Sequence, residues 1–353
     1  MITAPGKNST RSAIADWLEI RALLGFDSGS SIVMAVASTE GKDHGVDEDD
    51  DDEEIEVEIA ESGIENELDA VAYELGFRSD ALGEMYPFEY AALPSGHFSL
   101  TLTMDEENQA HQMYVFMLLI SAARDKRIAL PEKGLVPFMS QAGTLFHVCA
   151  SIGVAGLMHS GRTFWFGFPR PDGSNFLDAL KSLSAGLAFS KPKSQIPVGM
   201  SAQAKDEEID IVGWRPFVDN RLGGLIVLCQ AASGNNWSAK SIISAVPSFS
   251  KTFFNQSPYG YGVGAMAMPF MAHHEVELAS KDIDEDFEEA CYNRLWKTHS
   301  GFGVILDRIR IVQATRDVFD RADHSDAVAG IEQYPDVIAW TKGLLGDLAK
   351  VAA

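Results

Sequence analysis

A strand, a helix and a second strand follow one another in the last third of the chain. Residues 224–230 (GLIVLCQ) and 261–271 (YGVGAMAMPFM) are short apolar runs typical of buried strands. Between them, Ile242, Ile243 and Val246 have the spacing of the apolar side of a helix. A strand, helix, strand order implies parallel pairing with a right-handed crossover. The chain is therefore expected to contain a sheet with at least one parallel pair.

The rest of residues 131–353 supplies more elements for the same sheet. Residues 162–169 and 209–214 have strand patterns, whereas 141–156 and 176–188 have helical ones. We expect an α/β (α+β) domain over 131–353, with a mixed sheet flanked by helices and a mostly helical carboxyl terminus. The boundary is placed near residue 130, where two prolines bracket a glycine.

Residues 1–130 have mainly helical patterns. Ser12 is a candidate cap for a helix that ends at Gly25. Another helix, expected over 108–127, is apolar on nearly every side from Met113 to Ile120, which predicts burial on more than one face. Residues 97–104 alternate as a strand does. We expect a helical region over 1–130 that packs on the sheet domain.

The acidic run at 43–58 (DHGVDEDDDDEEIEVE) holds eleven carboxylates and no base, about half of the net charge of −23. Such a segment repels itself and cannot bury a core, so we expect a solvated, disordered loop. The alternative is a nucleic-acid mimic or a docking strip for a basic partner.

The cysteines favour a cytoplasmic protein. Cys149, Cys229 and Cys291 are far apart, odd in number and lie in apolar segments, as reduced thiols do. The start of the chain has no secretory signal pattern, and the most apolar helix candidate, 113–123, is about half the ~20 residues that a bilayer requires. The sequence thus predicts a cytoplasmic protein that does not interact with a membrane.

Three polar residues belong to neighbouring elements of the expected sheet. Asp210 lies in one strand, Gln230 ends the next, and Lys240 is expected one turn into the following helix. Side chains at matched ends of adjacent strands converge, because strands lie about 4.8 Å apart. A carboxylate, an amide oxygen and a lysine can hold Mg²⁺ or Mn²⁺ against a phosphodiester. The lysine would stabilise charge on the reacting oxygen.

This arrangement resembles the restriction-endonuclease-like PD-(D/E)XK nuclease superfamily. In that superfamily, a helix, a strand, an Asp-bearing strand, a strand ending in an acid or amide, and a helix follow in this order. The match covers roughly residues 135–315. The segments IDIVGW and LCQAASGNNWSAK are also similar to uncharacterised bacterial proteins, some of them encoded near phage-defence genes.

The chain departs from the superfamily pattern at three positions. The expected Glu is Gln230, which offers a carbonyl oxygen but no charge. Ala232 stands where the lysine is usual, so Lys240 would be a migrated substitute. The helical Glu is replaced by His147, which can ligate a metal or can mark a decayed site. An active nuclease and a degenerate copy both remain open.

Two more residues are candidate phosphate contacts. Arg170 follows a strand, and Asn236 lies before a helix. Each candidate also has an ordinary structural interpretation. Asp210 can pair with a nearby arginine, Gln230 can be a buried amide bonded to backbone, and Lys240 can be a surface residue.

The resulting prediction is a metal-dependent DNA endonuclease, a PD-(D/E)XK hydrolase, in a bacterial antiphage or foreign-DNA defence system. The acidic charge predicts a homo-oligomer, or a complex with another defence protein that supplies affinity for nucleic acid, DNA rather than RNA. The alternative is a catalytically inactive subunit of the same fold that serves as a scaffold, a sensor or a nucleic-acid-mimicking regulator.

Overall fold

The structure is a computed structural model of the chain. It describes residues 2–5, 9–33, 53–130, 134–159, 161–187, 191–195, 208–219, 224–234, 236–237, 240–255, 262–272, 293 and 300–352, with the backbone alone for 53–67. The acidic stretch 43–52 and Cys291 lie outside these residues.

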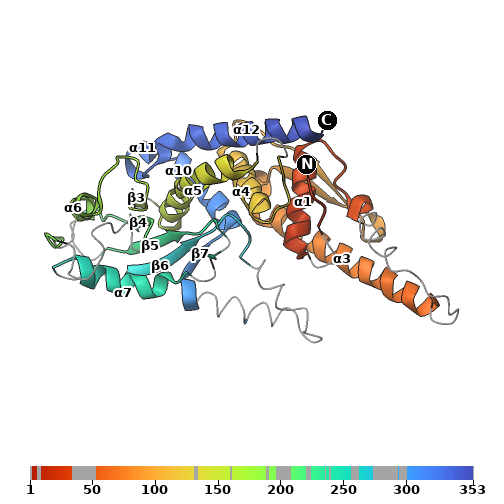
Figure 1. The fold of residues 1–353 in the computed structure, drawn as a ribbon, viewed down its shortest axis with the longest axis horizontal. Helices are drawn as coiled ribbons and strands as arrows, with labels where there is room; N and C mark the ends of the chain where they lie inside the picture. Colours follow the sequence, from red (N-terminus) through yellow and green to blue (C-terminus); the bar gives the residue numbers. More distant parts are fainter. Residues whose placement is uncertain are drawn as a thin grey trace.

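A five-stranded mixed sheet forms the centre of the larger half of the molecule (Figure 1). Its strands, in spatial and chain order, are β3 (Arg162–Trp165), β4 (Ile211–Trp214), β5 (Ile226–Ala231), β6 (Gly262–Ala267) and β7 (Val304–Leu306). The first three pair antiparallel, and β5, β6 and β7 pair parallel. The predicted parallel pair around the crossover helix is thereby confirmed, and so is the mixed α/β class.

Helices cover both faces of this sheet. Helices α6 (Phe176–Leu187) and α7 (Ile242–Phe253) pack on the face that bears Val212, Ile226 and Leu228. Helices α5 (Val136–Leu157) and α10 (Arg308–Phe319) lie on the other face, with Ile211, Val227 and Cys229. In Figure 1, α7 lies below the sheet and α5 above it. The two sets of apolar side chains lie on opposite faces because successive side chains of a strand point to opposite faces of the sheet.

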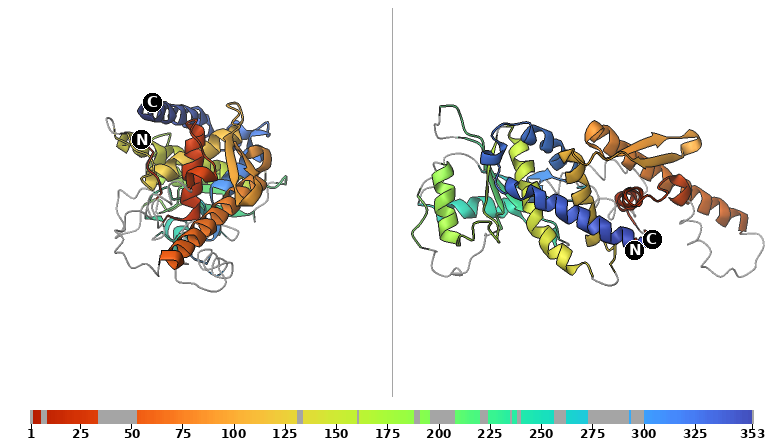
Figure 2. Two further views of the ribbon diagram at one scale, coloured as in Figure 1. Left: turned by 90° about the vertical axis from the view of Figure 1, so that its right-hand side faces the viewer. Right: turned by 90° about the horizontal axis from the view of Figure 1, so that it is seen from above.

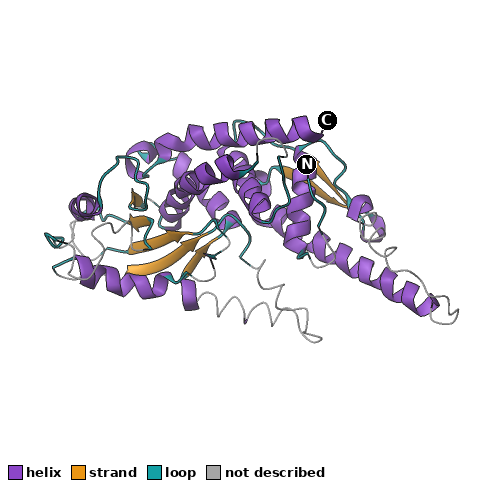
Figure 3. Ribbon diagram, viewed as in Figure 1, coloured by secondary structure: helices purple, strands orange, loops and turns teal. Residues whose placement is uncertain are grey.

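The amino-terminal elements form the other half. They are α1 (Arg11–Leu23), α3 (Glu53–Leu82), the 3₁₀ turn Gly83–Met85, the antiparallel hairpin of β1 (Phe88–Ala92) and β2 (Phe98–Leu102) with the turn Pro94–Gly96, and α4 (Gln109–Arg124). The chain ends with α11 (His324–Ala327), the turn Ile331–Gln333 and α12 (Tyr334–Ala352). Figure 2 shows α3 extending away from the rest of the chain, and Figure 3 shows how helical this half is.

One hydrophobic core continues across the predicted boundary near residue 130. It joins Leu18 of α1 and Phe116 of α4 to Val148 of α5 and Cys229 of β5. Helix α4 is buried from Ala110 to Ala122, as its all-round apolar pattern predicts. The two predicted regions therefore share a core, and α12 lies against both α4 and α5.

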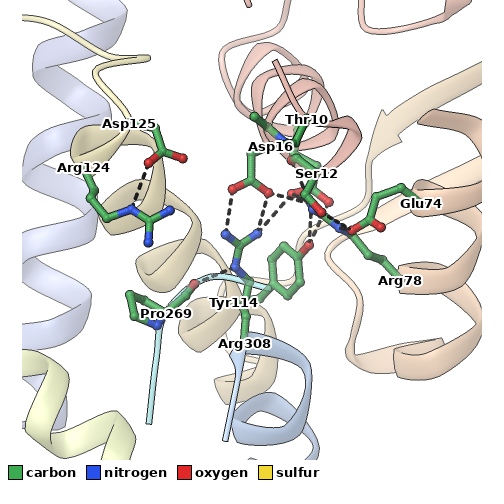
Figure 4. A network of polar contacts seen from close by, with 12 residues as sticks. Thr10, Ser12, Asp16, Glu74, Arg78, Tyr114, Arg124, Asp125, Pro269 and Arg308 are labelled. Carbon is green, nitrogen blue, oxygen red and sulfur yellow. Dashed lines mark hydrogen bonds and ion pairs between the residues drawn. The ribbon is translucent and has the colours of Figure 1, made fainter. Parts of the chain in front are cut away.

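A buried ionic network ties α1 to α10 (Figure 4). Arg308 donates two hydrogen bonds to Asp16, at 2.9 and 2.8 Å. Arg78 of α3 reaches the same carboxylate at 2.7 Å and also Glu19 and Glu74, at 2.9 and 2.8 Å. Burial alone would raise the pKa of Asp16, but the two guanidinium groups lower it well below its ordinary value. We call these five residues the Asp16 network.

Three sequence predictions need correction. Thr10, not Ser12, caps α1 by accepting from the Ala13 amide, while the Ser12 hydroxyl donates to Glu74 from inside the helix. Residues 53–58 of the predicted acidic loop are helical, because α3 begins at Glu53 and helix formation propagates cooperatively from an anchored segment. Helix α7 begins at Ile242, so Lys240 precedes the helix.

Among the described helices, α5 is long and apolar enough to cross a membrane by length and composition. Within its most apolar stretch, 67% of the residues are buried inside the protein. Core helices of folded domains have the same property.

Candidate metal centre at one edge of the sheet

Two of the predicted site residues lie at the edge where β3 and β5 end and β4 begins. Asp210 immediately precedes β4, and Gln230 is the last residue but one of β5. The paired register of β4 and β5 ends at Ile211 and Cys229, and the backbone amide of Asp210 donates to the carbonyl of the same Cys229, at 2.9 Å, so the pairing is irregular there. Asp210 and Gln230 therefore lie at the same end of neighbouring strands, and the convergence of their side chains stays a prediction.

Both carboxylate oxygens of Asp210 have partners. Oδ1 lies 3.3 Å from Nε2 of His147, which α5 carries over this edge of the sheet. Oδ2 accepts a hydrogen bond from the backbone amide of Ala231, at 2.8 Å. Asp210 is 9% exposed and His147 8% exposed. The structure thus brings together His147 and Asp210, two of the predicted residues, which are 63 positions apart in the sequence.

The backbone around Asp210 is irregular. Its carbonyl oxygen accepts from the amides of both Phe166 and Gly167, at 2.8 and 2.7 Å, which is the two-against-one pattern of a β-bulge. A Cβ atom at Gly167 would lie 2.5 Å from Asp210 Oδ1 and 2.9 Å from His147 Nε2. Glycine is therefore required at position 167, because the His147 and Asp210 pair occupies the space that a side chain would need.

The His147 ring is fixed on two sides. Nδ1 lies 3.2 Å from the carbonyl oxygen of Thr144, one turn earlier in α5. Trp165 of β3 stacks on the ring, with 5.0 Å between centroids and 18° between planes. The Trp165 indole donates in turn to the carbonyl of Gly167, at 3.0 Å. These contacts aim Nε2 at Asp210.

Charges and burial shift both pKa values. Burial alone would raise the pKa of Asp210, but His147, the Ala231 amide and Lys240 together lower it below the ordinary 3.8. Burial alone would lower the pKa of His147, but Asp210 and the carbonyls of Thr144 and Gly143 raise it above the ordinary 6.5. Both shifts favour the charged form of each side chain, as expected for an ion pair.

The ion pair predicts how stability varies with pH. The raised pKa of His147 gives stability that is complete below pH 6.5 and is lost as the pH rises through the folded-state pKa. The lowered pKa of Asp210 gives stability that is complete above pH 3.8 and is lost as the pH falls through the folded-state pKa. Urea unfolding in EDTA should show His147→Gln costing more free energy at about pH 5 than at about pH 9. An equal cost at the two pH values would contradict the ion pair.

Gln230 is buried, at 3% exposure, and its Oε1 has no hydrogen-bond partner among the described residues. Strand alternation places its side chain on the face of β5 shared with Leu228, opposite to that of Cys229. A buried acceptor without a donor is costly, so a ligand for this oxygen would stabilise it.

The structure also describes the other three predicted residues. Lys240 is partly buried in the turn before α7, and its charge contributes to the lowered pKa of Asp210. Asn236 is exposed in the same turn. Arg170 is 6% exposed, with its guanidinium 5.0 Å from the Phe166 ring centroid and one nitrogen donating to the Ser174 carbonyl at 3.1 Å. Its role as a phosphate contact stays a prediction.

The donor atoms that lie together at this edge are the Asp210 carboxylate and the His147 imidazole nitrogen, both of which can bind a divalent cation. The unpartnered amide oxygen of Gln230 belongs to the other face of β5. The described residues contain no group of three or more His, Cys, Asp and Glu side chains placed to hold a metal. A cation at the His147 and Asp210 pair would therefore need water to complete its coordination.

Sequence reasoning missed the residues that orient the site. Trp165 and Gly167 belong to RTFWFGFPR, in which a glycine directly follows a run of aromatic strand residues. Glycine in or beside a strand often marks a bulge or a close approach of other groups, and this signal was available. The carbonyl of Thr144 carries no sequence signal.

Comparisons of the chain with protein-family models, curated protein sequences and solved structures found no match.

Proposed function

We propose that this protein is a divalent-cation-dependent nuclease that hydrolyses phosphodiester bonds of DNA on a restriction-endonuclease-like core. The supporting observation is the order α5, β3, β4, β5, α7, with α6 inserted between β3 and β4, Asp210 and Gln230 at the same end of neighbouring strands, and His147 of α5 touching Asp210. This is the element order of the superfamily that the sequence resembles.

Each residue has a distinct role in this proposal. Asp210 and Gln230 hold Mg²⁺ or Mn²⁺, and the bound cation would polarise the phosphoryl oxygen and activate a water. Lys240 stabilises negative charge on the attacking or leaving oxygen. His147 orients the Asp210 carboxylate through the 3.3 Å contact. Arg170 and Asn236 contact flanking phosphates.

The charge of the chain affects how it binds DNA. A net charge of −23 opposes association with a polyanion, since phosphate contacts dominate such affinity. We propose a cytoplasmic homo-oligomer, or a complex with a second defence protein, in which the partner surface supplies basic residues. The defence setting follows from the sequence resemblance.

A second candidate function is a non-catalytic subunit of the same fold. Two observations favour it: both oxygens of Asp210 are already paired within the chain, and Asp210 is the one carboxylate among the described residues placed for the site. Such a subunit would act as a scaffold, a sensor or a nucleic-acid mimic.

A cleavage assay separates the two functions. Wild-type protein, with any gene product encoded beside it, should nick plasmid DNA with Mg²⁺ or Mn²⁺ and not with EDTA. Lys240→Ala should lower the rate about 100-fold, the typical effect of removing one group that stabilises transition-state charge. Lys251→Ala is the control, because Lys251 is exposed in α7. No cation-dependent cleavage by wild type, or equal rates for both variants, would favour the non-catalytic subunit.

A further inference from the structure

We propose that His147 is itself a ligand of the cation and makes the site prefer a first-row transition cation such as Mn²⁺ over Mg²⁺. The proposal rests on the proposed function only in taking Asp210 as the place where a cation binds. In this proposal, Trp165 is a positioning residue for His147.

The orientation of the His147 ring is that of a metal-binding histidine. Ligating histidines usually donate the second ring N–H to a carboxylate or a backbone carbonyl, which fixes the tautomer and the ring plane. In His147, Nδ1 faces the Thr144 carbonyl at 3.2 Å, which leaves Nε2 as the nitrogen directed at Asp210. Nε2 is buried and makes no hydrogen bond of acceptable geometry with the described residues.

The spacing of the two donor atoms suits one shared cation. Two ligands at about 2.1 Å from one ion, roughly 90 to 110° apart, lie about 3.0 to 3.4 Å from each other. Nε2 of His147 and Oδ1 of Asp210 are 3.3 Å apart. Gly167 lets the two side chains approach the β3 backbone closely, since a Cβ there would lie 2.5 and 2.9 Å from the two atoms.

Trp165 holds the His147 ring at this distance from Asp210. It stacks on His147 at 5.0 Å, and its indole N–H is anchored on the Gly167 carbonyl at 3.0 Å. Because Trp165 belongs to β3, the His147 imidazole is positioned by the sheet as well as by its own helix α5. Loss of such outer partners typically costs about 10- to 100-fold in metal affinity.

The donor set then determines which cation is preferred. Mg²⁺ requires near-octahedral oxygen ligands and keeps several waters. Imidazole nitrogen favours first-row transition metals, whereas Mn²⁺ also accepts carboxylate and carbonyl oxygens. A site with one carboxylate, one imidazole and water therefore suits Mn²⁺ better than Mg²⁺.

Binding of MnCl₂ and MgCl₂ to the full chain, stripped with EDTA and without DNA, tests this by calorimetry. We expect wild type to bind Mn²⁺ at least about tenfold more tightly than Mg²⁺, and His147→Gln to lose most of this preference. Electron spin echo spectroscopy of bound Mn²⁺ should show nitrogen coupling in wild type that His147→Gln lacks. His159→Gln is the matched control, because His159 is exposed and lies beside Asp317.

Further variants separate ligation from packing. His147→Glu supplies an oxygen ligand, so it should bind a cation without nitrogen coupling and with its preference shifted toward Mg²⁺. Trp165→Leu should weaken Mn²⁺ binding about tenfold and Mg²⁺ binding less, and Trp165→Phe, which keeps an aromatic ring against His147, should restore part of the loss. Circular dichroism in EDTA checks that each variant folds.

Several results would overturn the proposal. They are equal affinity of wild type for the two cations, no Mn²⁺ binding at all, or nitrogen coupling that persists in His147→Gln. The nuclease proposal can fail separately. If the protein binds Mn²⁺ through His147 but does not cut DNA, the ligand role of His147 stands and the nuclease proposal fails. If wild type and His147→Gln cut DNA equally well, and equally with Mg²⁺ and Mn²⁺, the ligand role of His147 is refuted and the nuclease proposal stands.

Discussion

Replacing Arg308 by Met is expected to lower the free energy of unfolding by about 3 to 5 kcal/mol, because a charge left behind in the interior loses its partner. Arg308 is fully buried and makes two hydrogen bonds to Asp16 and one to the Pro269 carbonyl. Methionine fills part of the volume but leaves Asp16 with Arg78 as its remaining cation. Urea denaturation measures the loss.

Arg316→Met provides the matched control on the same helix. Arg316 is 55% exposed and pairs with the exposed Glu84 at 3.3 Å, so its loss should cost about 0 to 1 kcal/mol. Combining Arg308→Met with Asp16→Asn should cost less than the sum of the two single changes, because the orphaned charge is removed. Equal losses for Arg308→Met and Arg316→Met would show that the Asp16 network does not stabilise the fold.

The Asp16 network illustrates what sequence patterns cannot predict. Asp16 and Arg308 are 292 positions apart, and neither departs from its local helical pattern. Sequence patterns also fail to predict β7 and β1. Strand β7 has only three residues, too few for a periodic signal, and β1 pairs with β2 after a turn without a standard hairpin sequence. These elements are determined by tertiary contacts.

Local patterns sufficed where each element has a strong period or a buried run. Helix α4 is apolar all round, and β5 and β6 are continuous apolar runs around an amphipathic helix, which implies their parallel pairing. The same reasoning placed Asp210 and Gln230 at the same end of neighbouring strands. It could not show that the strand pairing is irregular at Asp210, or that Lys240 precedes its helix, because both depend on irregular backbone.

The orientation of Asp210 leads to the largest expected effect on activity. Asp210→Asn should lower cation-dependent cleavage by about 1,000-fold or more, because the amide loses the charge that binds the cation while the volume is kept. Its side-chain oxygen can still accept from the Ala231 amide, as Oδ2 does at 2.8 Å, so the variant should fold. Initial rates of plasmid nicking at saturating Mn²⁺ measure the change.

Asp178→Asn is the control for the loss of one negative charge. Asp178 is 52% exposed on α6, where it pairs with Lys181 at 2.7 Å. It should cleave at the wild-type rate. A folded Asp210→Asn protein that also cleaves at the wild-type rate would remove Asp210 from the chemistry and leave the His147 and Asp210 pair as a purely structural contact. If instead Asp210→Asn loses both cleavage and Mn²⁺ binding while Asp178→Asn retains both, the one carboxylate at this edge both holds the cation and supports hydrolysis.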